Sequence, residues 1–186
     1  MQKQRAQWWA DLAKERPENL IFLDESGITT EMTRRYGRGL GGQRVPDSTP
    51  GRWRTLTMLG AVGLSGWVAT MSIEAPTDGE VFRAYLQHVL CPKLKPGQVV
   101  VMDNLSAHKV EGVRELIQST GARLRYLPPY SPDLNPIEMC WAQLKQHLRA
   151  AKARSVAALE RALDVALQAF IPEQAAACYR HCGYMA

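Results

Sequence analysis

The 186-residue chain lacks any hydrophobic run long enough to cross a membrane, since a spanning helix needs about 20 consecutive apolar residues. The longest candidate, residues 56–68, is interrupted by Gly60, Gly63, Ser65 and Gly66. The N-terminus, which reads Met-Gln-Lys-Gln-Arg, also lacks the apolar segment of a secretory signal. We therefore expect a cytoplasmic protein without a membrane anchor.

Cysteine is scarce, with only Cys91, Cys140, Cys178 and Cys182 at irregular spacing. This pattern matches neither a disulfide framework nor a paired zinc knuckle. Cys178, His181 and Cys182 could share one face of a helix and bind zinc, but a fourth ligand is not evident. Reduced, partly buried thiols are the favoured interpretation.

Acidic residues are fewer than basic ones, 18 against 23, while 46% of the residues are hydrophobic. The hydrophobic content indicates a globular protein rather than a disordered one. The positive charge is concentrated in residues 31–55, with six arginines and two acids, and in residues 145–154, with four cations and no acid. Such patches suit a polyanionic partner, although a solvated surface is the alternative.

The hydrophobic pattern predicts an α/β fold, a mixed five-stranded sheet flanked by helices. Residues 27–51 are rich in Gly and Arg and contain two prolines, which predicts a long loop or extended arm. Residues 1–18 are expected to be an N-terminal helical extension and residues 19–186 the main domain. Strands are expected at residues 19–23, 54–64, 67–73, 99–102 and 123–127, and helices at residues 2–16, 79–90, 106–120, 136–152 and 156–170, with a last short helix after them.

Three acidic residues follow elements that could bring them together. Asp24 follows the apolar run 20–23, Asp103 follows the run 99–102, and Glu138 lies in the first turn of a predicted helix. Carboxylates at strand ends and at a helix start can converge on one divalent cation, because hard cations prefer oxygen ligands. The arrangement suits phosphodiester chemistry, in which metal ions activate a nucleophile and stabilise the leaving oxygen.

Each of these residues also has a structural interpretation. Asp24 could be a turn residue after a strand, and Asp103 could cap the helix that follows it. Asn135 and Glu138 have the spacing of a helix N-cap and the N3 position of a capping box. His108, at the start of a predicted helix, could bind a phosphate or be structural.

Three segments of the chain carry a recognisable pattern: Asp24-Glu25-Ser26, residues 101–108 (Val-Met-Asp-Asn-Leu-Ser-Ala-His) and residues 127–138 (Leu-Pro-Pro-Tyr-Ser-Pro-Asp-Leu-Asn-Pro-Ile-Glu). Together they resemble the catalytic domain of mariner-like bacterial insertion-sequence transposases. These enzymes belong to the DDE superfamily and have a ribonuclease-H-like fold. The resemblance covers residues 19–152, and the 34 residues between the second and third acids match the mariner spacing.

The resemblance implies that Asp24, Asp103 and Glu138 form a catalytic triad that binds Mg²⁺ or Mn²⁺, two ions in all. It implies cleavage of a DNA strand at the end of a mobile element and transfer of that end into target DNA. The arginine-rich segment 34–54 lies where relatives carry a loop that contacts DNA and a partner subunit, which implies a homodimer in the active complex. The candidate residues for binding double-stranded DNA are Arg34, Arg35, Arg38, Arg52, Arg54, His108, Lys145 and Arg149.

The chain departs from these relatives at its start. Only 23 residues precede Asp24, too few for the helix-turn-helix modules that read element ends. We therefore expect a catalytic domain alone, located at the bacterial nucleoid, with end recognition supplied by a separate or frameshift-fused segment. An inactive remnant that binds DNA or a partner without cleaving is the alternative. A phosphohydrolase with Asp24 as nucleophile is disfavoured, because Ser26 stands where a second aspartate is needed.

Overall fold

A single five-stranded sheet runs through the protein, a computed structural model of which describes residues 2–104 and 112–185. The strand order is β3-β2-β1-β4-β5. The central strand β1 pairs antiparallel with β2 and parallel with β4, so the sheet is mixed as predicted. The strands are β1 Leu20–Thr29, β2 Thr55–Gly63, β3 Gly66–Ile73, β4 Val99–Met102 and β5 Arg123–Tyr126.

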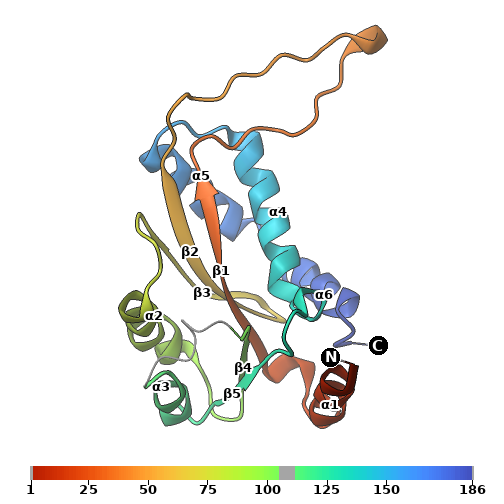
Figure 1. Ribbon diagram of the computed structural model, residues 1–186, viewed down its shortest axis with the longest axis vertical. Coiled ribbons are helices and arrows are strands. Elements are labelled where there is room, and N and C mark those ends of the chain that lie inside the picture. Colours follow the sequence, from red (N-terminus) through yellow and green to blue (C-terminus); the bar gives the residue numbers. More distant parts are fainter. Residues whose placement is uncertain (1, 105–111, 186) are drawn as a thin grey trace.

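Helices cover both faces of this sheet (Figure 1). Buried residues of α1, α4, α5 and α6 belong to one hydrophobic cluster, whereas those of α2 and α3 belong to a second cluster on the opposite face. In the described part of the chain, no helix is both long and apolar enough to span a bilayer. The helices are α1 Gln2–Leu12, α2 Gly79–Tyr85, α3 Val113–Ser119, α4 Pro136–Ala151, α5 Val156–Gln168 and α6 Pro172–His181.

The alternation of side chains along the central strands determines where the acidic residues point. Phe22 of β1 and Val101 of β4 pack in the cluster that contains α4, whereas Leu23 packs in the opposite cluster. Successive side chains of a strand point to opposite faces. Asp24 and Asp103, each two residues further on, are therefore directed to the face that α4 covers.

Strand β1 is longer than the sequence suggested. It continues past Asp24 because β2 pairs with it from Phe22 to Thr29, and Asp24 is paired with Gly60. The prediction that this strand ends at residue 23, just before Asp24, was therefore wrong. Parallel pairing with β4 nevertheless stops at Leu23, so Asp24 lies one residue beyond the edge that β4 forms.

Several predicted helices are shorter in the structure. Helix α1 ends at Leu12, and Arg16 is extended because it precedes Pro17. Helix α2 ends at Tyr85 and continues as a π-helical turn, Leu86–Leu90. Of the helix expected at residues 106–120, the described portion is α3.

Residues 30–54, which we call the arm, connect β1 to β2 and extend away from the body as two long limbs (Figure 1). The expected long loop is confirmed, although it begins later because β1 is longer. Its one regular segment is a 3₁₀ turn, Leu40–Gly42. Tyr36 and Leu40 on the arm are almost fully exposed. Long connections of this kind in compact domains are usually functional.

The four cysteines are free thiols. Cys140 of α4 is buried together with Cys178 and Cys182 from the C-terminal end of the chain. His181 is exposed, whereas Cys178 and Cys182 are buried. The zinc site considered from sequence is not formed, since no cluster of metal-binding side chains occurs among the described residues.

Candidate active site

A cavity of about 460 Å³ opens at the edge of the sheet where β4 ends. Asp24 from β1, Asp103 just after β4 and Glu138 from α4 all line it. Residues 127–132, which precede α4, also line it. The structure thus brings together the three acids that the sequence analysis singled out.

Glu138 lies in the first turn of α4 and is exposed at the mouth of this cavity. The alternative that it forms a capping box with Asn135 is wrong. The side chain of Asn135 makes no capping hydrogen bond, and its amide oxygen has no partner in the described structure. The backbone N–H of Asn135 donates instead to the carbonyl of Pro132 at 3.0 Å, so it is not available to a Glu138 carboxylate.

Asp24 is buried, and its Oδ1 accepts a hydrogen bond from the backbone N–H of Glu25 at 2.8 Å. Its cross-strand neighbour is Gly60. A Cβ atom on Gly60 would lie 2.5 Å from the Trp141 ring and 2.9 Å from the Trp67 ring. Glycine is therefore needed here to let α4 approach the sheet closely, and this approach sets the separation between Asp24 and the helix that carries Glu138.

Lys145 places a positive charge beside these acids. It follows Glu138 by two turns on the same face of α4. Partial burial is the main cause that lowers the pKa of Lys145, and repulsion from Arg149 adds to it. The carboxylates of Glu138 and Asp24 act on this pKa in the opposite direction, which shows that the ammonium group lies within electrostatic range of both.

The segment 128–135, which we call the motif loop, is fastened from outside the cavity. The Arg5 guanidinium binds the Asp133 carboxylate and donates to the Ser131 hydroxyl at 3.1 Å. The Tyr184 hydroxyl donates to the carbonyl of Leu134 at 2.6 Å. The sequence analysis missed Arg5 and Tyr184, because no local pattern reveals contacts between the two ends of the chain and its middle.

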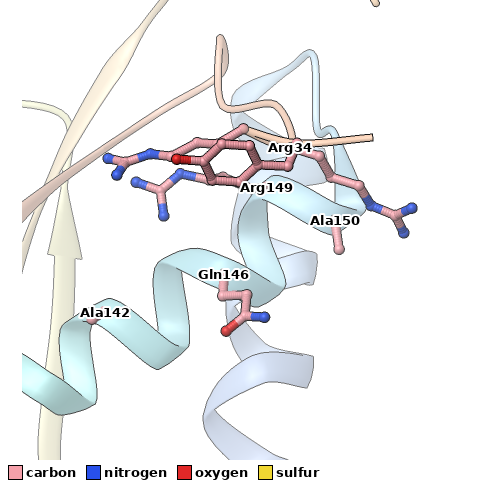
Figure 2. A pocket seen from close by; sticks show the side chains of 7 residues that line it. Arg34, Ala142, Gln146, Arg149 and Ala150 are labelled. Carbon is pink, nitrogen blue, oxygen red and sulfur yellow. The ribbon is translucent and has the colours of Figure 1, made fainter. Parts of the chain in front are cut away.

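Arg34 and Arg35, two of the candidate DNA-binding residues on the arm, lie close to a third, Arg149 on α4. Together with Gln146 and other residues they line a cavity of about 590 Å³. Figure 2 shows Arg34 above the last turns of α4, where Gln146 and Arg149 lie. The arm and the helix thus present their positive charges to a shared space.

The remaining candidates lie apart from this space. Arg38 lines a neighbouring cavity at the base of the arm, and Arg52 is exposed on the returning limb. Arg54 forms an ion pair with Glu74 after β3. His108 lies outside the described residues.

The donor set of the cavity suits a hard divalent cation, because Asp24, Asp103 and Glu138 offer carboxylate oxygens. Within residues 2–104 and 112–185, however, no three acidic, histidine or cysteine side chains form a ready-made metal-binding group. The three carboxylates thus line one cavity but do not form a complete ligand set in the described part of the chain.

Comparison with known structures identifies the fold. The chain is similar to the mariner Mos1 paired-end complex with Mg, with a TM-score of 0.73 and 18% identity over 96% of this chain and 56% of that one. It is also similar to the catalytic domain of the Mos1 mariner transposase, with a TM-score of 0.66 and 14% identity over 96% and 84% of the two chains. The expected ribonuclease-H-like fold is confirmed.

The sequence identifies the family. A family model for DDE superfamily endonucleases matches residues 19–160. The chain therefore belongs to the DDE superfamily of endonucleases. No curated protein sequence matches it significantly. It spans 56% of the Mos1 chain in the paired-end complex.

Proposed function

We propose that the chain is the catalytic domain of a transposase that cleaves DNA at the ends of a mobile element and joins those ends to target DNA. The observation that carries the proposal is that Asp24, Asp103 and Glu138 line one cavity from three separate elements. The similarity to Mos1 strand-transfer and paired-end complexes supports the same function.

We assign the three carboxylates as ligands of Mg²⁺ or Mn²⁺, two ions in all. Such ions, when bound, lower the pKa of a coordinated water and stabilise the leaving oxygen. Buried Asp24, held by strand pairing and by the Glu25 N–H, would be the rigid ligand, and exposed Glu138 would be the more mobile one. Mos1 structures that contain Mg and Mn support this assignment.

Double-stranded DNA is the proposed substrate, and the cations beside the acids are its proposed contacts. Lys145 lies next to the carboxylates, whereas Arg149, Arg34 and Arg35 lie further out. Phosphates bound by these groups would lead the backbone toward the acidic cavity. Phosphate contacts of this kind position DNA and carry little sequence information.

The partners are proposals as well. We propose a homodimer in the active complex, and a separate or frameshift-fused helix-turn-helix segment that reads the element ends. The Mos1 paired-end complex, which contains a transposon end, supports an assembly on DNA. The bacterial cytoplasm at the nucleoid is the proposed location.

Mn²⁺ binding tests the function directly. We would measure Mn²⁺ binding by titration calorimetry and by anomalous diffraction for the wild type, Asp103→Asn and a control, Glu25→Gln. Glu25 is the neighbour of Asp24 in β1, but its side chain points to the other face of the sheet. We expect Asp103→Asn to lose the ion and metal-dependent DNA cleavage, and Glu25→Gln to keep both. Metal binding and cleavage at wild-type levels in Asp103→Asn would remove Asp103 from the mechanism.

The non-cleaving alternative is favoured by one observation, that no ready-made metal-binding group occurs among the described residues. Salt-sensitive DNA binding without any cleavage by the wild type in Mg²⁺ or Mn²⁺, even with end-binding protein added, would establish that alternative. Cleavage that depends on all three acids would exclude it.

A further inference from the structure

Residues 152–155, which we call the corner, connect α4 to α5 and bind both limbs of the arm at its base. Nη1 of Arg154 donates hydrogen bonds to the carbonyls of Thr30 and Met32, at 2.9 and 3.1 Å. Nη2 donates to the carbonyl of Ser48 at 3.0 Å. One guanidinium therefore bridges the outgoing limb and the returning limb of the arm.

A second cation of the same corner binds the returning limb. The ammonium group of Lys152 lies 2.6 Å from the carboxylate of Asp47. The hydrogen bond from Lys152 is the main cause that holds the pKa of Asp47 below its ordinary value, and the Ser48 N–H adds to it. Arg154 and Lys152 thus both bind the returning limb, at residues 47–48.

The corner that carries these cations is itself well defined. Lys152 adopts a left-handed conformation that ends α4, and its N–H donates to the carbonyl of Leu148. Ala153 is buried, and the hydroxyl of Ser155 caps α5. The backbone that carries the side chains of Lys152 and Arg154 is therefore held in place by hydrogen bonds and by burial.

The bound limbs carry the arginines that face α4. Arg34 and Arg35 follow Met32 closely, and they line the cavity shared with Arg149. Their position over the helix depends on the direction in which the outgoing limb leaves the body. Burial is the main cause that lowers the pKa of Lys145 and of Arg149, and the charge of Arg35 adds a smaller effect to each. Like charges therefore oppose this position, and contacts at the base of the arm can offset them.

We propose that Arg154 and Lys152 are positioning residues that hold the arm over α4, so that Arg34, Arg35 and Arg149 bind one DNA backbone segment together. The inference rests on the proposed function, since it assumes that these arginines contact DNA. It also separates the basic segment 145–154 into two roles. Lys145 lies near the acids and Arg149 lines the cavity with Arg34 and Arg35, whereas Lys152 and Arg154 bind the arm itself.

Arg154→Lys is the decisive variant, with Arg154→Ala beside it. Lysine keeps the charge but cannot bridge three carbonyls with a planar fork. Hydrogen exchange of the arm without DNA should accelerate in both variants by roughly tenfold or more at the base, as expected when a local structure opens more often. Protected arm amides in both variants would overturn the proposal, whether or not the protein binds DNA.

DNA affinity supplies the second readout. Arg154→Lys should weaken salt-dependent binding about as much as Arg34→Ala with Arg35→Ala, and adding it to that pair should weaken binding no further. An additive effect, or wild-type affinity of Arg154→Lys, would overturn the positioning role. Absence of DNA binding by the wild type would contradict the proposed function instead. The hydrogen-exchange experiment would still decide whether Arg154 holds the arm in place.

A charge exchange tests Lys152 separately. Lys152→Asp and Asp47→Lys should each increase the rate of amide hydrogen exchange in the returning limb. The double variant, which restores an ion pair of opposite polarity, should return that rate to the wild-type value. If the double variant remained as open as the single ones, the ion pair would not hold the arm.

Discussion

Arg5 and Asp133 are 128 positions apart in the sequence, yet the guanidinium of one donates to the carboxylate of the other at 2.9 Å. This hydrogen bond ties α1 to the motif loop that leads into Glu138. Trp8 and Leu12 of the same helix are buried in the core. The helix before β1 therefore supports the candidate active site although it lies outside the region that matches the family.

Arg5→Ala should lower the melting temperature at neutral pH, because Asp133 loses its partner. Arg5 holds the pKa of Asp133 below its ordinary 3.8. The pair's contribution to folding stability is thus fully present above pH 3.8 and is lost as the pH falls through the lowered pKa of Asp133 in the folded state. We expect the difference in melting temperature from the wild type to narrow in acid, as measured by calorimetry between neutral pH and pH ~2.

Arg16→Ala is the matched control for that measurement. Arg16 pairs with Glu18 across 3.3 Å with both side chains largely exposed, and such surface pairs contribute little. An equal melting shift in both variants, or a shift for Arg5→Ala that is constant with pH, would show that the Asp133 ion pair is not its cause.

Gly60→Ala should destabilise the fold by about 1–3 kcal/mol, the usual cost of overpacking a core. The added methyl group would meet Trp141 and push α4 away from Asp24. Metal affinity at the acidic cavity should fall with it. Gly27→Ala is the control, because its Cβ would meet no atom within 4 Å. Denaturant unfolding and Mn²⁺ titration of both variants give the comparison, and equal stability would show that α4 shifts at no cost.

Arg34→Ala with Arg35→Ala should weaken DNA binding and reduce the slope of log affinity against log salt by roughly 0.9 for each phosphate that is no longer neutralised. Arg161→Ala, an exposed arginine of α5 that lines neither cavity of the arm, should leave the slope unchanged. Fluorescence anisotropy across a salt series measures both. Identical slopes for the double variant and the wild type would make these arginines ordinary surface residues.

The thiols should react very unequally with a thiol reagent in the folded state. Burial raises the pKa of Cys182 to about 11, and Cys140 is fully buried. Cys91 is the most accessible of the four, although partial burial raises its pKa as well. We expect one slow native-state reaction that Cys91→Ser removes, and four reactive thiols after denaturation. A native reaction that persists in Cys91→Ser would show that the α4–α6 region opens.

The sequence predicted the sheet and the acidic cavity for a physical reason. Apolar runs such as residues 99–102 are too continuous for any position but a buried strand, and they deliver Asp103 to the strand edge. Local patterns could not show how far β1 extends, because that depends on its pairing with β2. They also could not show that the Asn135 side chain makes no capping hydrogen bond to α4, since both arrangements share the same sequence spacing.

The roles of the cations were the least predictable part. Arg149 and Arg154 are chemically identical and lie five positions apart. Only the tertiary structure shows that Arg149 lines the cavity with Arg34, whereas Arg154 binds arm carbonyls. The charge of a segment indicates a polyanion partner, but the direction of each side chain depends on where the helix ends.

The parallel pairing of β1 with β4 has a consequence for biosynthesis. The strand that carries Asp24 emerges from the ribosome long before the one that precedes Asp103, and the two acids become neighbours only after the Leu23–Met102 pairing forms. The buried Tyr179 hydroxyl, which donates to the carbonyl of Leu20 at 2.8 Å, joins later still. Non-local pairing of this kind slows folding. The acidic cavity therefore cannot be complete in a nascent chain until β4 and the first turn of α4 have both been translated.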